Sequence, residues 1–161
     1  MRPDISAAID RFAAAASALN DALVGLTAAD LIATPVPGTW SIQQIVLHLV
    51  DSDLVMADRM KRIIAEDIPL LVGFDESAWA KRLDYGSSDP HLAAEVFRLN
   101  RLHLAAILRR QSDETFDRYG IHTQAGKKTL LDFLTGYYGD HLDHHMGHLR
   151  RKRELLGKPL S

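Results

Sequence analysis

Five of the eight histidines lie in two short stretches of the chain, and four of these are paired at the spacing of metal ligands. Residues 141–148 contain His141, His144, His145 and His148. Residues four apart on a helix stand about 5–6 Å apart at Cβ, so such a pair can direct two imidazole nitrogens at one divalent ion. The segment offers two such pairs, His141 with His145 and His144 with His148.

The apolar pattern of this segment favours the first pair as ligands. At about 100° per residue, its apolar residues define a face whose centre lies close to His141 and His145, with His144 and His148 on one flank. These apolar residues are Leu130, Leu134, Tyr137, Tyr138, Leu149 and Leu156. Two inward histidines bring several polar nitrogens into an apolar core, and a metal ion can satisfy them. The pair His144/His148 stays a geometric competitor.

His48, far away in the sequence, can supply a third imidazole across the core. It flanks the apolar stripe of its own segment, which consists of Ile45, Leu49 and Met56. A buried, hydrogen-bonded core histidine is the alternative interpretation of His48. The same interpretation applies to His103, which we place on the inward stripe of the third helix.

Four amphipathic segments can position these residues. Apolar residues at helical spacing predict long helices over residues 4–24, 41–66, 88–111 and 129–156. Ser41 and Gln44 have the spacing of a capping box, Asp89 precedes a proline, and Gly157 follows the last helix. The inward stripe predicted for the third helix consists of Leu92, Val96, Leu99, Ala106 and Ile107.

The segments between these helices are long and rich in turn residues. We expect one turn of helix over residues 27–30, a second short helix over 75–83, and loop over 112–127 despite a β-like stretch at 118–122. Four long helices without a convincing sheet predict an all-α four-helix bundle with long crossover loops, with residues 1–161 forming one domain.

The composition excludes several classes of function. The chain has 161 residues, 47% apolar and 25% charged, as in an ordinary globular domain. A formal net charge of -2 argues against a nucleic-acid partner. The basic run at residues 150–153 suits the C-terminal end of a helix.

Cysteine is absent, which excludes disulfides and thiolate ligands, so any thiol chemistry needs an external thiol. The Ala-rich N-terminal segment lacks the apolar core of a signal peptide, and no apolar run approaches the roughly 18 residues of a membrane span. We therefore expect a cytoplasmic protein without a membrane partner.

Residues 40–51, WSIQQIVLHLVD, and residues 141–150, HLDHHMGHLR, resemble the two signature segments of the DinB-like family. The resemblance covers nearly the whole chain, including the tail at 155–159, and is loosest over 67–127. It implies a four-helix bundle, usually a homodimer, that takes one metal ligand from the first segment and two from the second. Carried over, these ligands are His48, His141 and His145.

The resemblance also implies a divalent metal and thiol chemistry, because the family includes bacillithiol S-transferases and a mycothiol-dependent maleylpyruvate isomerase. Imidazole ligands suit zinc, nickel, copper and iron, and we expect zinc or nickel. Three neutral imidazoles leave the charge of the ion in place and a coordination position open. The leading hypothesis is a metal-dependent enzyme that activates a low-molecular-weight thiol or water for transfer or hydrolysis on a small molecule. The alternatives are a non-catalytic metal- or ligand-binding dimeric module and a dimerisation protein without metal.

No general base is assigned, but five residues are candidates for supporting positions. Tyr137 and Asp51 could orient the imidazoles. Arg59, Trp79 and His122 could line a pocket; their ordinary interpretations are a surface arginine, a packing tryptophan and an exposed loop histidine.

Overall fold

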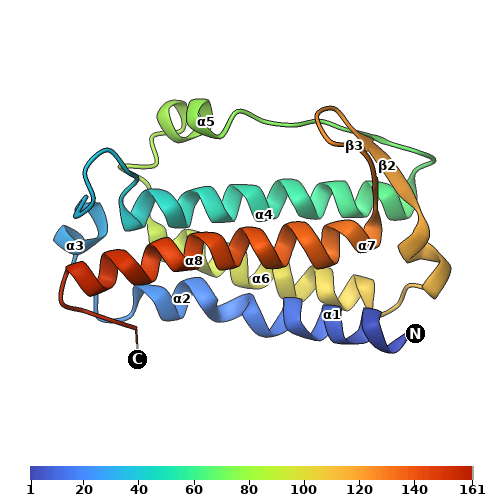
Figure 1. Cartoon of the computed structure of the whole chain (residues 1–161), viewed down its shortest axis with the longest axis horizontal. Helices are drawn as coiled ribbons and strands as arrows, with labels where there is room; N and C mark the ends of the chain where they lie inside the picture. Colours follow the sequence, from blue (N-terminus) through green and yellow to red (C-terminus); the bar gives the residue numbers. More distant parts are fainter. Residues whose placement is uncertain (161) are drawn as a thin grey trace.

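A bundle of four long helical rods forms the body of the protein in the computed structural model, which describes residues 1–160 apart from the side chains at 137 and 138 (Figure 1). The first rod consists of α1 (Pro3–Ala14), the 3-10 turn η1 (Ala15–Ser17) and α2 (Ala18–Leu23). The second and third are α4 (Ile42–Ala65) and α6 (Pro90–Leu108). The fourth consists of α7 (Leu130–Asp132), the π-helical segment η3 (Phe133–Tyr137) and α8 (Tyr138–Leu155). The predicted four-helix bundle is confirmed.

Local capping signals set the ends of these rods. The Ser41 hydroxyl accepts from the Gln44 amide at 3.2 Å, and the Gln44 side chain accepts from the Ser41 amide at 2.9 Å, completing the predicted capping box. Asp89 accepts from the amides of His91 and Leu92 at the start of α6. Gly157 takes a φ of +69°, the left-handed conformation that ends a helix.

The core has two clusters, and a buried ion pair lies between α4 and α6. Arg101 donates from Nε to Asp53 at 2.8 Å, and both side chains are almost fully buried. Asn100 donates to the second carboxylate oxygen of Asp53 at 2.6 Å. The guanidinium of Arg101 also stacks over the rings of Phe12 and Phe97. The pair therefore has the packing and hydrogen bonds that a buried charge requires.

The prediction for the inner face of α6 is wrong. Leu92, Val96 and Leu99 are 66%, 37% and 53% exposed, and His103 is exposed as well. The buried face consists of Ala93, Ala94, Phe97, Arg101, Leu104, Ala105 and Leu108. This face contains small alanines and a charged residue, whereas the opposite face contains larger aliphatic residues. A prediction from apolar periodicity therefore selects the opposite face. The core-histidine interpretation of His103 fails for the same reason.

The expectation of loop over residues 112–127 is also wrong. A 3-10 helix η2 (Asp113–Asp117) leads into β2 (Tyr119–His122), which pairs antiparallel with β3 (Gly126–Thr129) and parallel with β1 (Leu70–Leu71). Strands of two to four residues carry too little alternation to be predicted, and the β1–β2 pairing joins distant segments. A Cβ at Gly120 would lie 2.8 Å from the carbonyl oxygen of Pro69, so this close approach requires glycine.

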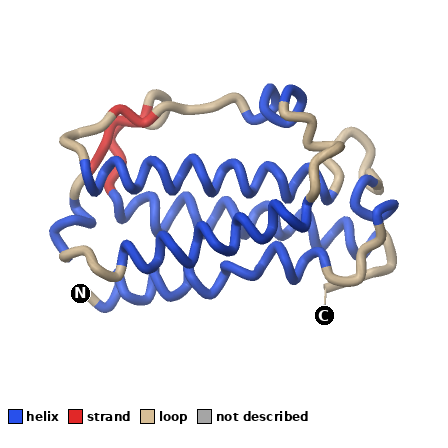
Figure 2. Tube along the Cα trace, turned by 180° about the vertical axis from the view of Figure 1, so that it is seen from behind, coloured by secondary structure: helices blue, strands red, loops and turns tan. Residues whose placement is uncertain are grey.

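The second crossover runs along the outer side of the bundle. It passes from the small sheet at one end of the molecule to the short helix α5 (Glu76–Arg82) above the N-terminal half of α4 (Figures 1 and 2). The predicted short helix of this crossover is therefore present. The crossover brings side chains from outside the four rods to the surface of α4.

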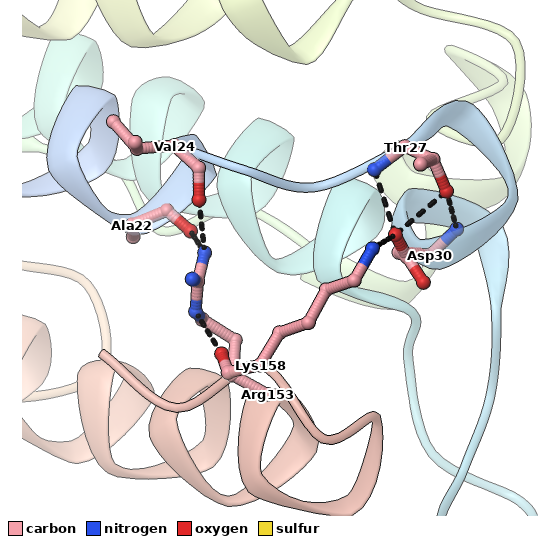
Figure 3. Close-up of polar contacts among 6 residues, drawn as sticks. All are labelled: Ala22, Val24, Thr27, Asp30, Arg153 and Lys158. Atoms are coloured by element: carbon pink, nitrogen blue, oxygen red, sulfur yellow. Dashed lines mark hydrogen bonds and ion pairs between the residues drawn. The ribbon is translucent and has the colours of Figure 1, made fainter. Parts of the chain in front are cut away.

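The C-terminal segment closes the other end of the bundle. Arg153 donates to the carbonyl oxygens of Ala22 and Val24 at 2.7 and 2.9 Å, and Lys158 donates to Asp30 at 2.5 Å (Figure 3). Asp30 also completes the capping box of α3 (Ala28–Ile32) with Thr27. None of the described helices is long and apolar enough to cross a membrane.

Candidate metal centre

His48 on α4 and His141 and His145 on α8 converge on one point between the two helices. Nε2 of His48 lies 3.2 Å from Nε2 of His141, and each of the three residues offers one nitrogen within 4.8 Å of the other two. Two nitrogens bound to one zinc-like ion at roughly 2.0–2.1 Å in a tetrahedron stand roughly 3.3 Å apart. The observed separation fits this value, so the structure brings the predicted trio together in a geometry that could hold a metal.

A π-helical segment sets the direction of the two α8 histidines. The segment η3 ends one turn before His141, and a π-bulge inserts one extra residue into the helical repeat. The core face therefore moves from the register of Leu130 and Leu134 to that of Leu142, Met146 and Leu149, all buried. His141 and His145 lie beside this face, half-buried, rather than at its centre as predicted. The shift keeps them within reach of solvent.

His48 holds its place by packing. Its side chain is fully buried, and its ring contacts the ring of Trp40, whose centroid is 5.0 Å away. Its ring centroid is 5.2 Å from that of His141 and 4.7 Å from that of His145. Nε2 of His48 faces the other imidazoles, as its 3.2 Å distance from Nε2 of His141 shows, and Nδ1 has no hydrogen-bond partner among the described residues.

The three imidazoles are neutral at physiological pH. Burial, and then the neighbouring charge of His141, lowers the pKa of His48 to about 4. Burial and the surrounding histidines lower the pKa of His145 to about 3, and burial also lowers the pKa of His141. Neutral imidazoles have the free lone pairs that a metal ion requires, so the donor set fits a divalent cation.

Glu76, which the sequence analysis did not single out, reaches this centre from α5. Its Oε2 lies 3.9 Å from Nε2 of His48. Burial, and then the nearby charge of Asp75, raises the pKa of the Glu76 carboxyl. Asp75 caps α5 by accepting from the Ala78 amide, which fixes the turn that carries Glu76. The sequence signal was a capped short helix in a long crossover, and it did not specify where that crossover would lie.

The Asp51 carboxylate anchors the crossover rather than an imidazole. It accepts a hydrogen bond from the hydroxyl of Tyr85. Gln43 donates to the carbonyl oxygens of Tyr85 and Gly86 at 3.0 and 2.7 Å and fastens the same segment to α4. The other residue considered for imidazole support, Tyr137, has its side chain outside the described part of the structure.

Arg59 and His122 lie beside the centre and are buried, contrary to their ordinary interpretations. They are 4% and 5% exposed, and both line a cavity that also includes His141 and Glu76. Trp79 is half-buried and packs on Phe74, with ring centroids 4.6 Å apart, as a packing tryptophan does.

The alternative ligand pair, His144 and His148, has the same spacing but lies on the surface of the protein. Its two Nε2 atoms also lie 3.2 Å apart, but both residues are exposed. Within the part of the chain that the structure describes, the group of three metal-ligating side chains is His48, His141 and His145. Geometry therefore favours the predicted trio.

Comparison with known proteins defines the class. Residues 11–149 match the model of the DinB superfamily, so the chain belongs to this family. A Bacillus licheniformis protein and YfiT of Bacillus subtilis, each named a "Putative metal-dependent hydrolase", are both 30% identical to it over 74% of this chain, and the matches cover 68% and 67% of their own lengths.

A solved structure supports the same grouping. YfiT from Bacillus subtilis, described as "a probable metal-dependent hydrolase with an unusual four-helix bundle topology", superimposes with a TM-score of 0.89 at 26% identity, covering 98% of this chain and 90% of the other. The fold is therefore that of this family.

Proposed function

We propose that the protein is a metal-dependent enzyme in which His48, His141 and His145 hold one divalent ion, zinc or nickel. The convergence of three neutral imidazoles beside the carboxylate of Glu76 carries this proposal. The names of the relatives, which describe metal-dependent hydrolases, support the same class. The substrate is a small molecule, because a cavity of about 550 Å³ that His141 lines has the size of a small-ligand site.

A bound ion supplies the positive charge that makes a nearby water or thiol more acidic. Glu76 takes the proton at its carboxylate. Its raised pKa moves it toward the pH at which a carboxylate both accepts and returns a proton efficiently. The His48 ring packs against the tilted ring of Trp40, and this packing supports the orientation of Nε2 toward the centre.

Both a water and an external thiol suit this arrangement as nucleophiles. Water leads to hydrolysis. A low-molecular-weight thiol leads to transfer, and it must come from outside because the chain has no cysteine.

We also propose that the active form is a homodimer formed through the outer face of α6. Its exposed residues Leu92, Val96, Leu99, His103 and Ala106 alternate in steps of four and three, the pattern of a helix that packs against a second helix. A row of large aliphatic side chains is a poor surface to leave in water.

The first experiment is elemental analysis of untagged protein. We expect about one divalent ion per chain. The double variant His141→Ala, His145→Ala should lose it. The double variant His144→Ala, His148→Ala is the matched control, because it removes two exposed histidines of the same helix at the same spacing, and it should keep the ion.

Activity is then screened in two arms, hydrolysis of small esters and amides and transfer of a thiol to small electrophiles. Catalytic turnover that disappears when the ion is removed supports the proposed enzymatic function. Full metal occupancy without turnover in either arm points to a non-catalytic binding module. If the wild-type protein takes up no ion even after divalent cations are added back, the proposal of a metal-dependent enzyme is wrong.

A further inference from the structure

A second pocket reaches the histidine centre from the end of the bundle where α4 begins and α8 ends. These two helix ends lie side by side near α3 (Figure 1). His145 lines the pocket, and its volume is about 220 Å³. Sites for drug-sized ligands measure roughly 300–1,000 Å³, so this pocket suits a molecule of about one ring with one polar group. A molecule bound there lies beside a ligand of the proposed metal.

Apolar side chains form most of the wall of this pocket. Val36 and Trp40 from the segment before α4 line it together with Ile45 from the first turn of that helix. The Trp40 ring is half-buried, so its exposed part is available to a ligand. An aromatic ring in a ligand can stack on the indole, and burial of its apolar surface favours binding.

Lys152 brings an amino group to the wall of this apolar pocket. The residue is 3% exposed, and its Nζ donates to Oγ1 of Thr39 at 2.6 Å. Thr39 and Lys152 both line the pocket, so the contact between them lies at its wall. The Thr39 hydroxyl donates its own proton to the carbonyl oxygen of Val36 at 2.8 Å. An ammonium has three N–H donors, and among the described residues Thr39 accepts from it, so two donors remain for a ligand.

The positive charge of Lys152 has no counter-ion in the part of the chain that the structure describes. No described carboxylate lines the pocket. Arg151 also lines it, but its Nη1 lies 3.5 Å from Oε2 of Glu154, and both side chains are exposed, so this pair adds little net charge. Burial lowers the pKa of Lys152, and no nearby acid opposes this effect. A buried ammonium without a counter-ion is costly, so a bound anion is favoured here.

We propose that this pocket binds a small carboxylic acid with an apolar body, its carboxylate at Nζ of Lys152 and its apolar part against Trp40. One ammonium balances one negative charge, which favours a carboxylate over a phosphate dianion. The inference rests on the proposed function and names the class of one substrate. The pocket shares no described lining residue with the cavity of about 550 Å³ at His141. Two molecules can therefore reach the centre together, as a transfer reaction requires.

The test is binding of benzoate, followed by the NMR signal of the Trp40 indole N–H group. The chain has two tryptophans, so the variant Trp79→Phe assigns this signal. Benzamide lacks the charge, acetate lacks the apolar body, and phenyl phosphate carries a dianion. Each titration is made on the protein as purified with its metal and again after chelation. We expect saturable shifts with benzoate in both states, and binding of benzamide and acetate about tenfold weaker or more.

Variants assign the binding to Lys152. Lys152→Met keeps an apolar chain and removes the charge, so benzoate binding should weaken about tenfold or more while benzamide binding stays unchanged. Val36→Asp places a carboxylate at the wall of the pocket and should also weaken benzoate binding, which keeps the test valid if Lys152→Met fails to fold. Arg150→Met is the matched control, because Arg150 is an exposed basic residue of the same helix outside the pocket, and it should bind benzoate like wild type.

Three results overturn the inference. Benzoate that binds Lys152→Met and Val36→Asp as tightly as wild type does not occupy this pocket. Benzoate binding that disappears on chelation shows that the metal, and not Lys152, holds the carboxylate. Phenyl phosphate that shifts the Trp40 signal at lower concentration than benzoate replaces the carboxylate class.

The same measurements separate this inference from the proposed function. Benzoate binding that depends on Lys152, in a protein that holds no metal and shows no turnover, supports the pocket while the proposed enzyme fails. Metal-dependent turnover in a protein that binds no benzoate supports the enzyme and overturns the pocket.

Discussion

Nε2 of His48 and Nε2 of His141 lie 3.2 Å apart although 93 residues separate them in the chain. Both rings are neutral at physiological pH, because burial lowers the pKa of each. A neutral imidazole carries one N–H and one lone pair, so without an ion one Nε2 donates a hydrogen bond to the other. With both protons on Nδ1, the two Nε2 lone pairs face one point and can bind a cation there.

The first prediction concerns the pH dependence of the metal-free protein. The folded state binds protons at His48 and His145 only near pH 4 and 3, whereas the unfolded chain binds them near 6.5. Stability contributed by these neutral rings is therefore full above about pH 6.5 and is lost as the pH falls below it. We expect the melting temperature of chelated protein to decline between about pH 6.5 and 4.

The double variant His141→Ala, His145→Ala should show a shallower decline over the same range, measured by circular dichroism melts. The variant His144→Ala, His148→Ala should keep most of the wild-type slope, because burial of the trio, the largest cause of the lowered pKa values, is unchanged. Equal slopes in all three proteins would show that the trio does not titrate as its burial requires.

The second prediction concerns Glu76. Glu76→Gln keeps the shape of the side chain and removes the proton acceptor, so kcat should fall about 10²–10⁴-fold while metal content stays unchanged. Steady-state kinetics with elemental analysis on the same samples make the measurement. Glu154→Gln, at an exposed carboxylate of α8, is the control. If Glu76→Gln instead loses the metal, Glu76 is a ligand and not the proton acceptor.

Helix ends could be predicted from the sequence because their signals are local. The Ser41 and Gln44 side chains bond each other's backbone within one turn, and no distant residue is needed for that contact. The one-turn spacing of His141 and His145 could be predicted for a similar reason, because it depends on helical geometry within one segment. His48 as the third member of the trio followed from the family resemblance.

Features that depend on contacts between residues far apart in the sequence could not be predicted. The inner face of α6 is marked by alanines and by Arg101, whose burial makes sense only once Asp53 is placed opposite it. Glu76 and His122 reach the centre through a crossover and a sheet whose short strands pair across about fifty residues, as Leu70 does with Ile121. The π-segment before His141 left no pattern that periodicity could detect.

The third prediction concerns the outer face of α6. Leu99 is 53% exposed in the middle of the proposed dimer stripe. A charge buried between two copies is strongly unfavourable, so Leu99→Asp should convert a dimer into a monomer of 17.9 kDa. Light scattering coupled to size-exclusion chromatography measures the mass. Leu155→Asp, an exposed leucine outside the stripe, should remain dimeric. A wild-type monomer, or a dimeric Leu99→Asp, contradicts this interface.

The contact between Lys158 and Asp30 ties the end of the chain to the segment after the first rod (Figure 3). The hydrogen bond from Lys158, and then those from Thr27, hold the pKa of Asp30 well below its usual value. A depressed folded-state pKa stabilises the protein above the unfolded pKa of about 3.9, and this stabilisation disappears as the pH falls through the folded pKa.

Lys158→Ala should therefore lower the melting temperature at pH 7 by about 2 °C. This difference should shrink as the pH falls below about 4, because the Asp30 carboxylate of the unfolded chain then begins to bind a proton while that of the folded protein does not. Calorimetric scans of both proteins across this range test it. Lys81→Ala, at an exposed lysine of α5, should melt like wild type at every pH. A difference that stays constant down to acid pH would show that Lys158 contributes through the packing of its aliphatic chain rather than through its charge, because packing does not depend on the protonation of Asp30.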